Sequence, residues 1–130
     1  MKARGCIKTA AILFGTFILV IVVLADLGFL QGQLRLLHSI PYGDKAGHFI
    51  LLGILTFLVV SSVLQSYPGW NPNRAVAGVA LVLAVLSGIE EASQIFFPGR
   101  HAGIEDLMAN YAGIFVFSLL AWQVNKKRTS

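Results

Sequence analysis

The sequence predicts an all-α, polytopic membrane protein: a four-transmembrane-helix bundle with an interfacial helix between spans 1 and 2. Of its 130 residues, 56% are hydrophobic and 12% are charged, a balance that does not suit a soluble domain. The apolar residues fall into four long blocks, each close to the roughly 20 residues needed to cross a bilayer. The breaks between the blocks are short, so residues 1–130 are expected to form a single membrane domain.

The first span is predicted over residues 9–25, after a basic N-terminal segment. A basic start before an apolar run also describes a signal peptide, with Val23-Leu24-Ala25 as its cleavage site. The run is longer than a usual signal core, however, and its removal would leave an odd number of spans. An uncleaved first helix is therefore the favoured interpretation.

An interfacial helix is predicted over residues 27–40. Leucines recur there at helical spacing while polar residues lie off the leucine stripe, and the stripe consists of Leu27, Leu30, Leu34 and Leu37. The segment is too short and too polar to cross a membrane. Its amphipathic pattern is typical of a helix that lies in the plane of the interface.

The remaining spans are predicted over residues 46–65, 74–97 and 106–124. A turn rich in Pro, Gly and Asn separates the second span from the third, and its aromatic residues suit the membrane surface. The fourth span opens at Glu105-Asp106, where acidic side chains interact favourably with the positive end of the helix dipole.

The basic residues predict the orientation of the bundle. With the N-terminus in the cytoplasm, seven basic residues lie inside and three lie outside; the inner ones are Lys2, Arg4, Lys8, Arg74, Lys126, Lys127 and Arg128, and the outer ones are Arg35, Lys45 and Arg100. All six acids and all three histidines then lie outside. We therefore expect a multi-pass protein of the inner (plasma) membrane with both termini cytoplasmic. This bias explains the net charge of +4 without nucleic acid as a partner.

Three predicted helix ends bring polar side chains to the outer level. Each end carries a pair about one turn apart, on one helix face; the pairs are Asp44 with His48, Glu91 with Gln94, and Asp106 with Asn110. Gly113 lies one turn below Asn110 and leaves room for a neighbouring helix or a ligand. The single cysteine, Cys6, excludes an internal disulfide and a cysteine-based metal site.

These residues predict an outward-facing polar pocket, because so many groups of mixed sign at one depth exceed what helix packing requires. The predicted ligand-binding residues are Asp44, Lys45, His48, Glu91, Gln94, Arg100, Asp106 and Asn110. Each also has a simpler interpretation. The Asp and His could be a helix cap and an interfacial residue, the two cations could snorkel, and the two amides could join helices.

Three motifs in chain order resemble the VanZ-like family of small bacterial membrane proteins. They are Asp44-Lys45-x-x-His48-Phe49, Glu91-x-x-Gln94-x-Phe96-x-Pro98-Gly99-Arg100 and Asp106-x-x-x-Asn110-x-x-Gly113. The resemblance selects Glu91, rather than its neighbour, as the inward-facing acid. It departs at residues 101–105, where a Ser or a second acid is expected after the arginine. It implies a link to teicoplanin resistance and supplies no reaction.

Three functions are expected from these residues. The first is binding, with or without modification, of an outer-leaflet amphiphile such as a phospholipid, a lipid-linked cell-wall precursor or a lipoglycopeptide, with Lys45 and Arg100 facing its oxyanion and no cofactor needed. The second is an intramembrane enzyme, metal-dependent or acid/base, with His48, Glu91 and Asp106 as catalytic candidates. The third is a structural scaffold. The clean inner halves of the spans argue against ion conduction.

Overall fold

The computed structural model describes residues 2–39, 43–96 and 103–129, and these residues form helices and turns without strands. The elements are α1 (Lys2–Asp26), α2 (Gln31–Ser39), α3 (Gly43–Ser66), α4 (Pro72–Ser93), a short 3₁₀ helix η1 (Gln94–Phe96) and α5 (Ile104–Thr129). Four of them, α1, α3, α4 and α5, are long and apolar enough to cross a membrane. The predicted all-α fold class, with four helices long and apolar enough to span a membrane, is confirmed.

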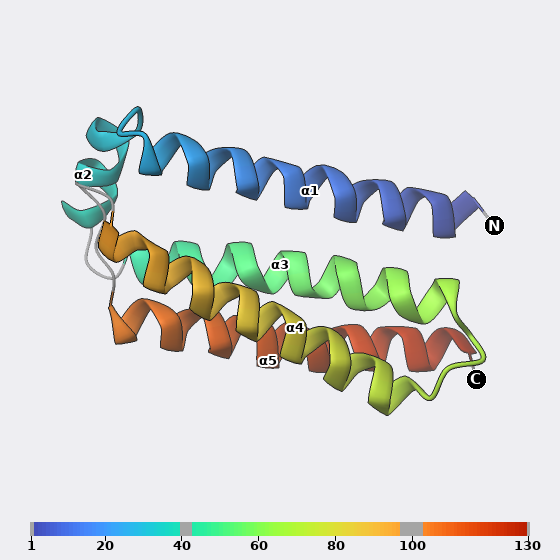
Figure 1. Cartoon of the computed structure of the whole chain (residues 1–130). Helices are drawn as coiled ribbons and strands as arrows, with labels where there is room; N and C mark the ends of the chain where they lie inside the picture. The colour runs from blue at the N-terminus through green and yellow to red at the C-terminus, as the bar shows by residue number, and fades with distance from the viewer. Residues whose placement is uncertain (1, 40–42, 97–102, 130) are drawn as a thin grey trace.

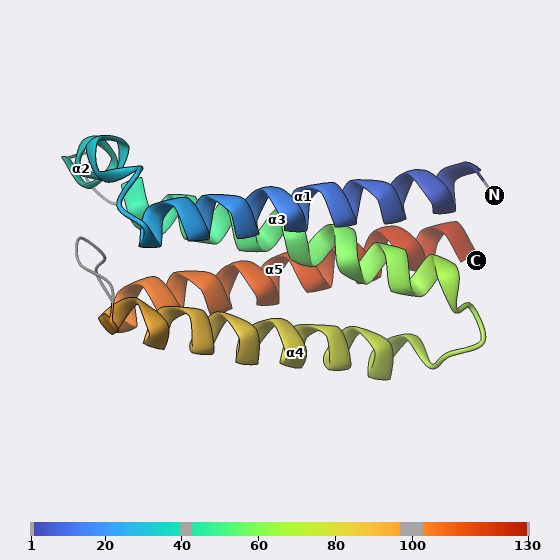
Figure 2. The ribbon, with the colours of Figure 1, turned by 45° about the horizontal axis from the view of Figure 1, so that its top comes forward.

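The four long helices lie side by side, and each runs opposite to the one before it in the chain (Figure 1). One end of the bundle carries both chain termini and the turn between α3 and α4; we call it the terminus end. The other end carries α2, the starts of α3 and α5, and the end of α4; we call it the α2 end. Figure 2 shows α1 beside α3, and α4 beside α5.

The seam between α3 and α5 is the centre of the bundle, because these two helices make the most extensive contact. A side chain at Gly113 would collide with the backbone carbonyl of Phe49, and one at Gly53 would collide with the ring of Phe117. Glycines let two helix backbones approach closely in a membrane, where packing rather than water drives association. Val60, which is fully buried, lies seven residues after Gly53 and therefore on the same face of α3.

Helix α1 is attached more loosely. It packs on α3, and Ala25 is the single buried residue among its described side chains. Its large apolar side chains, such as Ile12, Leu13 and Leu19, are more than 60% exposed in the isolated chain. This exposure suits a helix whose outer face is solvated by lipid.

The turn after α1 corrects the predicted start of the interfacial helix, which is Gln31 and not residue 27. Gly28 has a positive φ of 88°, its N–H donates to Ala25, and the N–H of Phe29 donates to Leu24. This is the Schellman pattern, in which a left-handed glycine ends a helix. The first two leucines of the predicted stripe therefore lie in a turn, and α2 is shorter than expected.

Both ends of α4 have a local cause. At its start, the Asn71 side chain accepts hydrogen bonds from the backbone N–H groups of Asn73 and Arg74, at 3.0 and 3.4 Å, and Pro72 occupies the first helical position. This is a favoured helix start. At its other end the helix tightens into η1, so the α-helix ends at Ser93, short of the predicted span end at residue 97.

Candidate functional site

The α2 end brings together side chains from α3, α4 and α5. Six of the eight predicted site residues have described side chains, and these are Lys45, His48, Glu91, Gln94, Asp106 and Asn110. The side chain of Asp44, and the whole of Arg100, lie outside the described residues. We call five of the residues at this end the His48 cluster, and they are the half-buried His48 and the buried Ser87, Glu91, Asp106 and Asn110.

A chain of hydrogen bonds crosses three helices in this cluster. Nδ1 of His48 lies 3.0 Å from Oδ1 of Asn110, and Nδ2 of Asn110 donates to Oγ of Ser87 at 2.8 Å. Because the amide nitrogen is engaged with the serine, the amide oxygen faces the imidazole and Nδ1–H is the donor. A neutral His48 in this tautomer keeps a lone pair on Nε2.

Nε2 of His48 faces acidic side chains. It lies 4.0 Å from Oδ2 of Asp106, and one ligand atom each of His48, Glu91 and Asp106 lies within 4.8 Å of the other two. We call these three residues the triad; Glu91 is 5% exposed and Asp106 is 7% exposed, whereas His48 is half-buried. An imidazole and two carboxylates in this arrangement can exchange protons, hold a cation or bind a hydrogen-bonding head group.

Glu91 is held by one oxygen. Oε1 accepts a hydrogen bond of 2.9 Å from the backbone N–H of Gly103, just before α5. Oε2 is buried and has no hydrogen-bond partner among the described residues. Buried polar atoms are nearly always paired, because an unpaired one loses its water without compensation. The free oxygen therefore marks a place where a further group can bind.

Two more polar pairs lie around the cluster. Nζ of Lys45 lies 2.9 Å from Oε2 of Glu105, with the lysine side chain 32% exposed and the glutamate 77% exposed. Gln94, expected on the same face as Glu91, instead donates to both carboxylate oxygens of Glu90, at 2.8 and 2.9 Å. Gln94 lies four residues after Glu90, and this spacing stacks the two side chains on the last helical turn.

Gly113 lies as the sequence interpretation allowed, whereas Ser87 was missed by it. Gly113 was a candidate for close approach by a helix or a ligand, and the backbone of α3 occupies that space. Ser87 was not among the predicted site residues, although its hydroxyl accepts from Asn110. The sequence spacing could have identified Ser87, because it precedes Glu91 by four residues and so shares its helix face.

A second polar cluster, which the sequence pattern did not predict, joins α3 and α5 at the terminus end. Nδ2 of Asn125 donates to Oγ of Ser61 at 3.0 Å and to the carbonyl of Ala121 at 2.7 Å. Nε2 of Gln65 donates to Oδ1 of Asn125 at 3.1 Å. We call Ser61, Gln65 and Asn125 the Asn125 cluster. The sequence spacing could have indicated this cluster, because Ser61 and Gln65 are four residues apart and so lie on one helix face.

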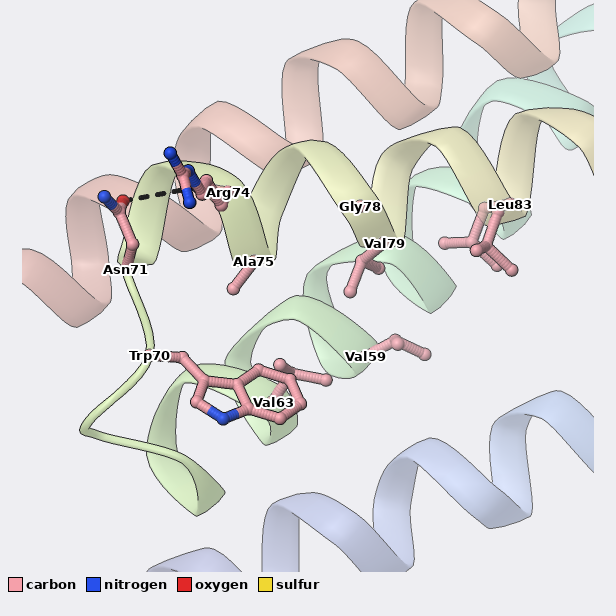
Figure 3. Close-up of a pocket in the computed structure, with 10 residues that line it drawn as sticks. Val59, Val63, Trp70, Asn71, Arg74, Ala75, Gly78, Val79 and Leu83 are labelled. Atoms are coloured by element: carbon pink, nitrogen blue, oxygen red, sulfur yellow. Dashed lines mark hydrogen bonds between the residues drawn. The ribbon is translucent and has the colours of Figure 1, made fainter.

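An apolar groove of about 580 Å³ lies between α3 and α4, away from the His48 cluster. Figure 3 shows Val59 and Val63 of α3 on one side, Val79 of α4 opposite, and Trp70 toward the terminus end. Arg74 contributes its side chain near the cap of α4. The apolar lining suits lipid chains rather than the polar head expected at the opposite end of the bundle.

Comparison with known proteins indicates which family the chain belongs to. The family model VanZ/LLP1 matches residues 10–125, which include every residue of the His48 cluster and nearly all of the four long helices. No curated protein and no solved structure matches the chain significantly. The match covers most of the chain and agrees with the three motifs at the α2 end. The protein therefore belongs to the VanZ/LLP1 family of membrane proteins.

Proposed function

We propose that the protein binds the polar head of an outer-leaflet amphiphile at the α2 end of its bundle. The observation that carries the proposal is the His48 cluster, where two buried acids and an imidazole meet at the ends of three helices. Ionisable groups at membrane depth are costly, and they are characteristic of binding and transport sites.

The charge distribution supports an outward α2 end. The α2 end holds Glu90, Glu91, Glu105 and Asp106, while the terminus end holds basic residues such as Lys8 and Arg74. Basic residues favour the cytoplasmic side of a membrane. The proposed topology therefore has both termini in the cytoplasm, in the inner membrane, with the His48 cluster at the outer leaflet.

The shape of the surface suits an amphiphile. Ile95, Phe96, Ile104 and Met108 lie close in sequence to the clustered acids and are 63–83% exposed. Acyl chains can lie against these side chains while the head reaches the polar groups. A hydroxyl or amine of the head would donate to Oε2 of Glu91.

An oxyanion of the same head would be engaged by cations at the rim. Lys45 is within reach, because its ion pair with Glu105 is partly exposed and exchangeable. Arg100 is the second cation that we assign to this role, since a guanidinium binds phosphate or carboxylate bidentately. A phospholipid, a lipid-linked cell-wall precursor and a lipoglycopeptide all combine these features. Their capture would give the protein a role in the cell envelope and in resistance of the teicoplanin type.

Native mass spectrometry of the detergent-purified protein tests the proposal. The double substitution Lys45→Gln with Arg100→Gln is expected to remove co-purifying lipid, because the head loses both cationic contacts, while the bundle still folds. Arg35→Gln is the matched control, since Arg35 is an exposed cation of α2 at the same end. The control should retain the lipid.

Retention of the same lipids by the double variant would refute the proposal. The same samples separate binding from chemistry, because a lipid that the protein modifies changes in mass during incubation. A modified lipid that disappears with Glu91→Gln, while binding persists, would identify the protein as an enzyme acting on the lipid.

A further inference from the structure

We propose that His48, Glu91 and Asp106 form a binding site for a divalent transition-metal ion. The three residues come from α3, α4 and α5, so the site joins three helices at the α2 end. One ligand atom of each lies within 4.8 Å of the others. Imidazole nitrogen and carboxylate oxygen are both common ligands of such ions.

The imidazole is oriented as a metal ligand requires. Nδ1–H of His48 is held by Oδ1 of Asn110, and the amide of Asn110 is held in turn by Ser87. Histidine ligands in proteins almost always donate their second nitrogen to an oxygen in this way, which fixes the tautomer and the ring. The arrangement presents the lone pair of Nε2 toward Asp106, whose Oδ2 lies 4.0 Å away.

The carboxylates supply the negative charge and a free oxygen. Glu91 is anchored through Oε1 by Gly103, while its Oε2 is buried without a partner among the described residues. Asp106, in the first turn of α5, is buried as well. Two buried carboxylates converge beside the imidazole, and their oxygens together with the imidazole nitrogen make a donor set that a divalent cation can bind.

The ligand set also selects the ion. Ligand atoms around Zn²⁺, at about 2.0–2.2 Å from the metal, lie roughly 3.4 Å apart in a tetrahedral site. Binding therefore needs the three atoms to approach by up to about 1.5 Å, which small side-chain rotations provide. The nitrogen ligand favours Zn²⁺ over Mg²⁺ and Ca²⁺, which take oxygen, and the two carboxylates also suit Mn²⁺, which serves as the paramagnetic probe.

Three protein ligands leave a coordination position open. Structural zinc sites fill all four positions with protein, whereas sites that act on a ligand keep one for water or substrate. An oxyanion could occupy this position at the α2 end. The metal proposal itself does not depend on lipid binding, because it concerns the triad and the ion alone.

Calorimetric titration of the full chain with Zn²⁺ and with Mn²⁺ tests the site. The protein is purified in detergent with a histidine-free tag and stripped with a chelator. We expect one saturable site per chain. Glu91→Gln and Asp106→Asn should weaken binding by more than about tenfold, the lower bound for loss of an outer-shell partner of a metal ligand.

The chain offers a matched control beside each ligand. Glu90→Gln removes the acid next to Glu91, which pairs with Gln94, and Glu105→Gln removes the acid next to Asp106, which pairs with Lys45. Both controls should bind the ions within about threefold of the parent protein, because each removes an acid that is paired with another side chain and lies outside the triad. Absence of a saturable site in the parent protein, or equal weakening by the controls, would overturn the proposal.

A spectroscopic measurement on the unsubstituted protein tests the site even if the substituted proteins fail to fold. Pulsed electron paramagnetic resonance of the Mn²⁺-loaded chain should show coupling to a directly bound imidazole nitrogen. Its loss in His48→Gln would assign the nitrogen to His48. A spectrum with oxygen ligands and no nitrogen coupling would contradict the triad.

Discussion

The His48 cluster and the Asn125 cluster share one hydrogen-bonding arrangement at opposite ends of α5. In each, an asparagine of α5 donates its amide to a serine of a neighbouring helix: Asn110 to Ser87 at 2.8 Å, and Asn125 to Ser61 at 3.0 Å. In each, the asparagine oxygen faces a side chain of α3. At the terminus end that side chain is Gln65, which is neutral.

The two clusters differ in the α3 residue and in the groups beyond it. At the α2 end this residue is His48, and beyond it lie Glu91 and Asp106. Hydrogen bonds between membrane helices contribute about 0.6 kcal/mol each on average, so neutral amides and hydroxyls already suffice to join α3 to α5. Charged side chains in a membrane helix are costly, with about 2.5–3.5 kcal/mol as the value at its centre. The comparison therefore separates groups that hold the bundle together from groups that we propose it carries for a ligand.

The largest expected loss of stability comes from Gly113→Ala. This substitution would disturb both clusters, because each contains an asparagine of α5. The added methyl group would collide with the carbonyl of Phe49 and push α5 away from α3. Overpacking of this kind costs about 1–3 kcal/mol. We expect a lower unfolding temperature in detergent and weaker metal binding. Gly78→Ala is the control, because nothing lies within 4 Å of a methyl group there.

Paired substitutions of the two asparagines should give similar losses of stability and different losses of function. Asn125→Leu and Asn110→Leu each remove interhelical hydrogen bonds worth about 0.6–1.7 kcal/mol. Asn110→Leu should also weaken Zn²⁺ binding by about 10–100-fold, since His48 loses its orienting partner. Equal effects of the two substitutions on Zn²⁺ affinity would remove the distinction between the clusters.

The smallest expected change in the free energy of unfolding is a gain rather than a loss. Glu91→Gln should raise the free energy of unfolding by about 1 kcal/mol in the presence of a chelator, because it replaces a buried carboxylate, one oxygen of which has no partner among the described residues, with a neutral amide of the same shape. Its amide oxygen can still accept from Gly103. Glu90→Gln should give no such gain, since both oxygens of Glu90 are paired with Gln94. A loss of stability in Glu91→Gln would instead indicate that this acid helps to hold the bundle together, as the Asn125 cluster does.

Much of the fold could be predicted because long apolar blocks determine membrane helices directly. The family, the four spans and the existence of a short helix before the second span were all predicted from the residue pattern. The start of that helix was predicted wrongly, because the leucine stripe continued through a turn that Gly28 creates. A left-handed glycine ends a helix regardless of the apolar pattern around it.

The site was harder to predict because spacing within one helix does not fix partners across helices. Spacing placed His48 and Asn110 on inward faces, but it could not show that one donates to the other. It also paired Gln94 with Glu91, whereas Gln94, at the start of η1, is bonded to Glu90. Ser87 and the Asn125 cluster were not predicted because uncharged polar residues stand out little within an apolar span.

The central seam between α3 and α5 has a consequence for biogenesis. Its two helices are the second and the last of the four spans to be synthesised. Until α5 leaves the ribosome, His48, Ser61 and Gln65 sit in inserted helices without the asparagines that later join them. Assembly of the bundle therefore waits until α5, the last of these four helices, has been synthesised. A nascent chain that lost α5 would lose both clusters at once and present unpaired polar groups to quality-control proteases in the membrane.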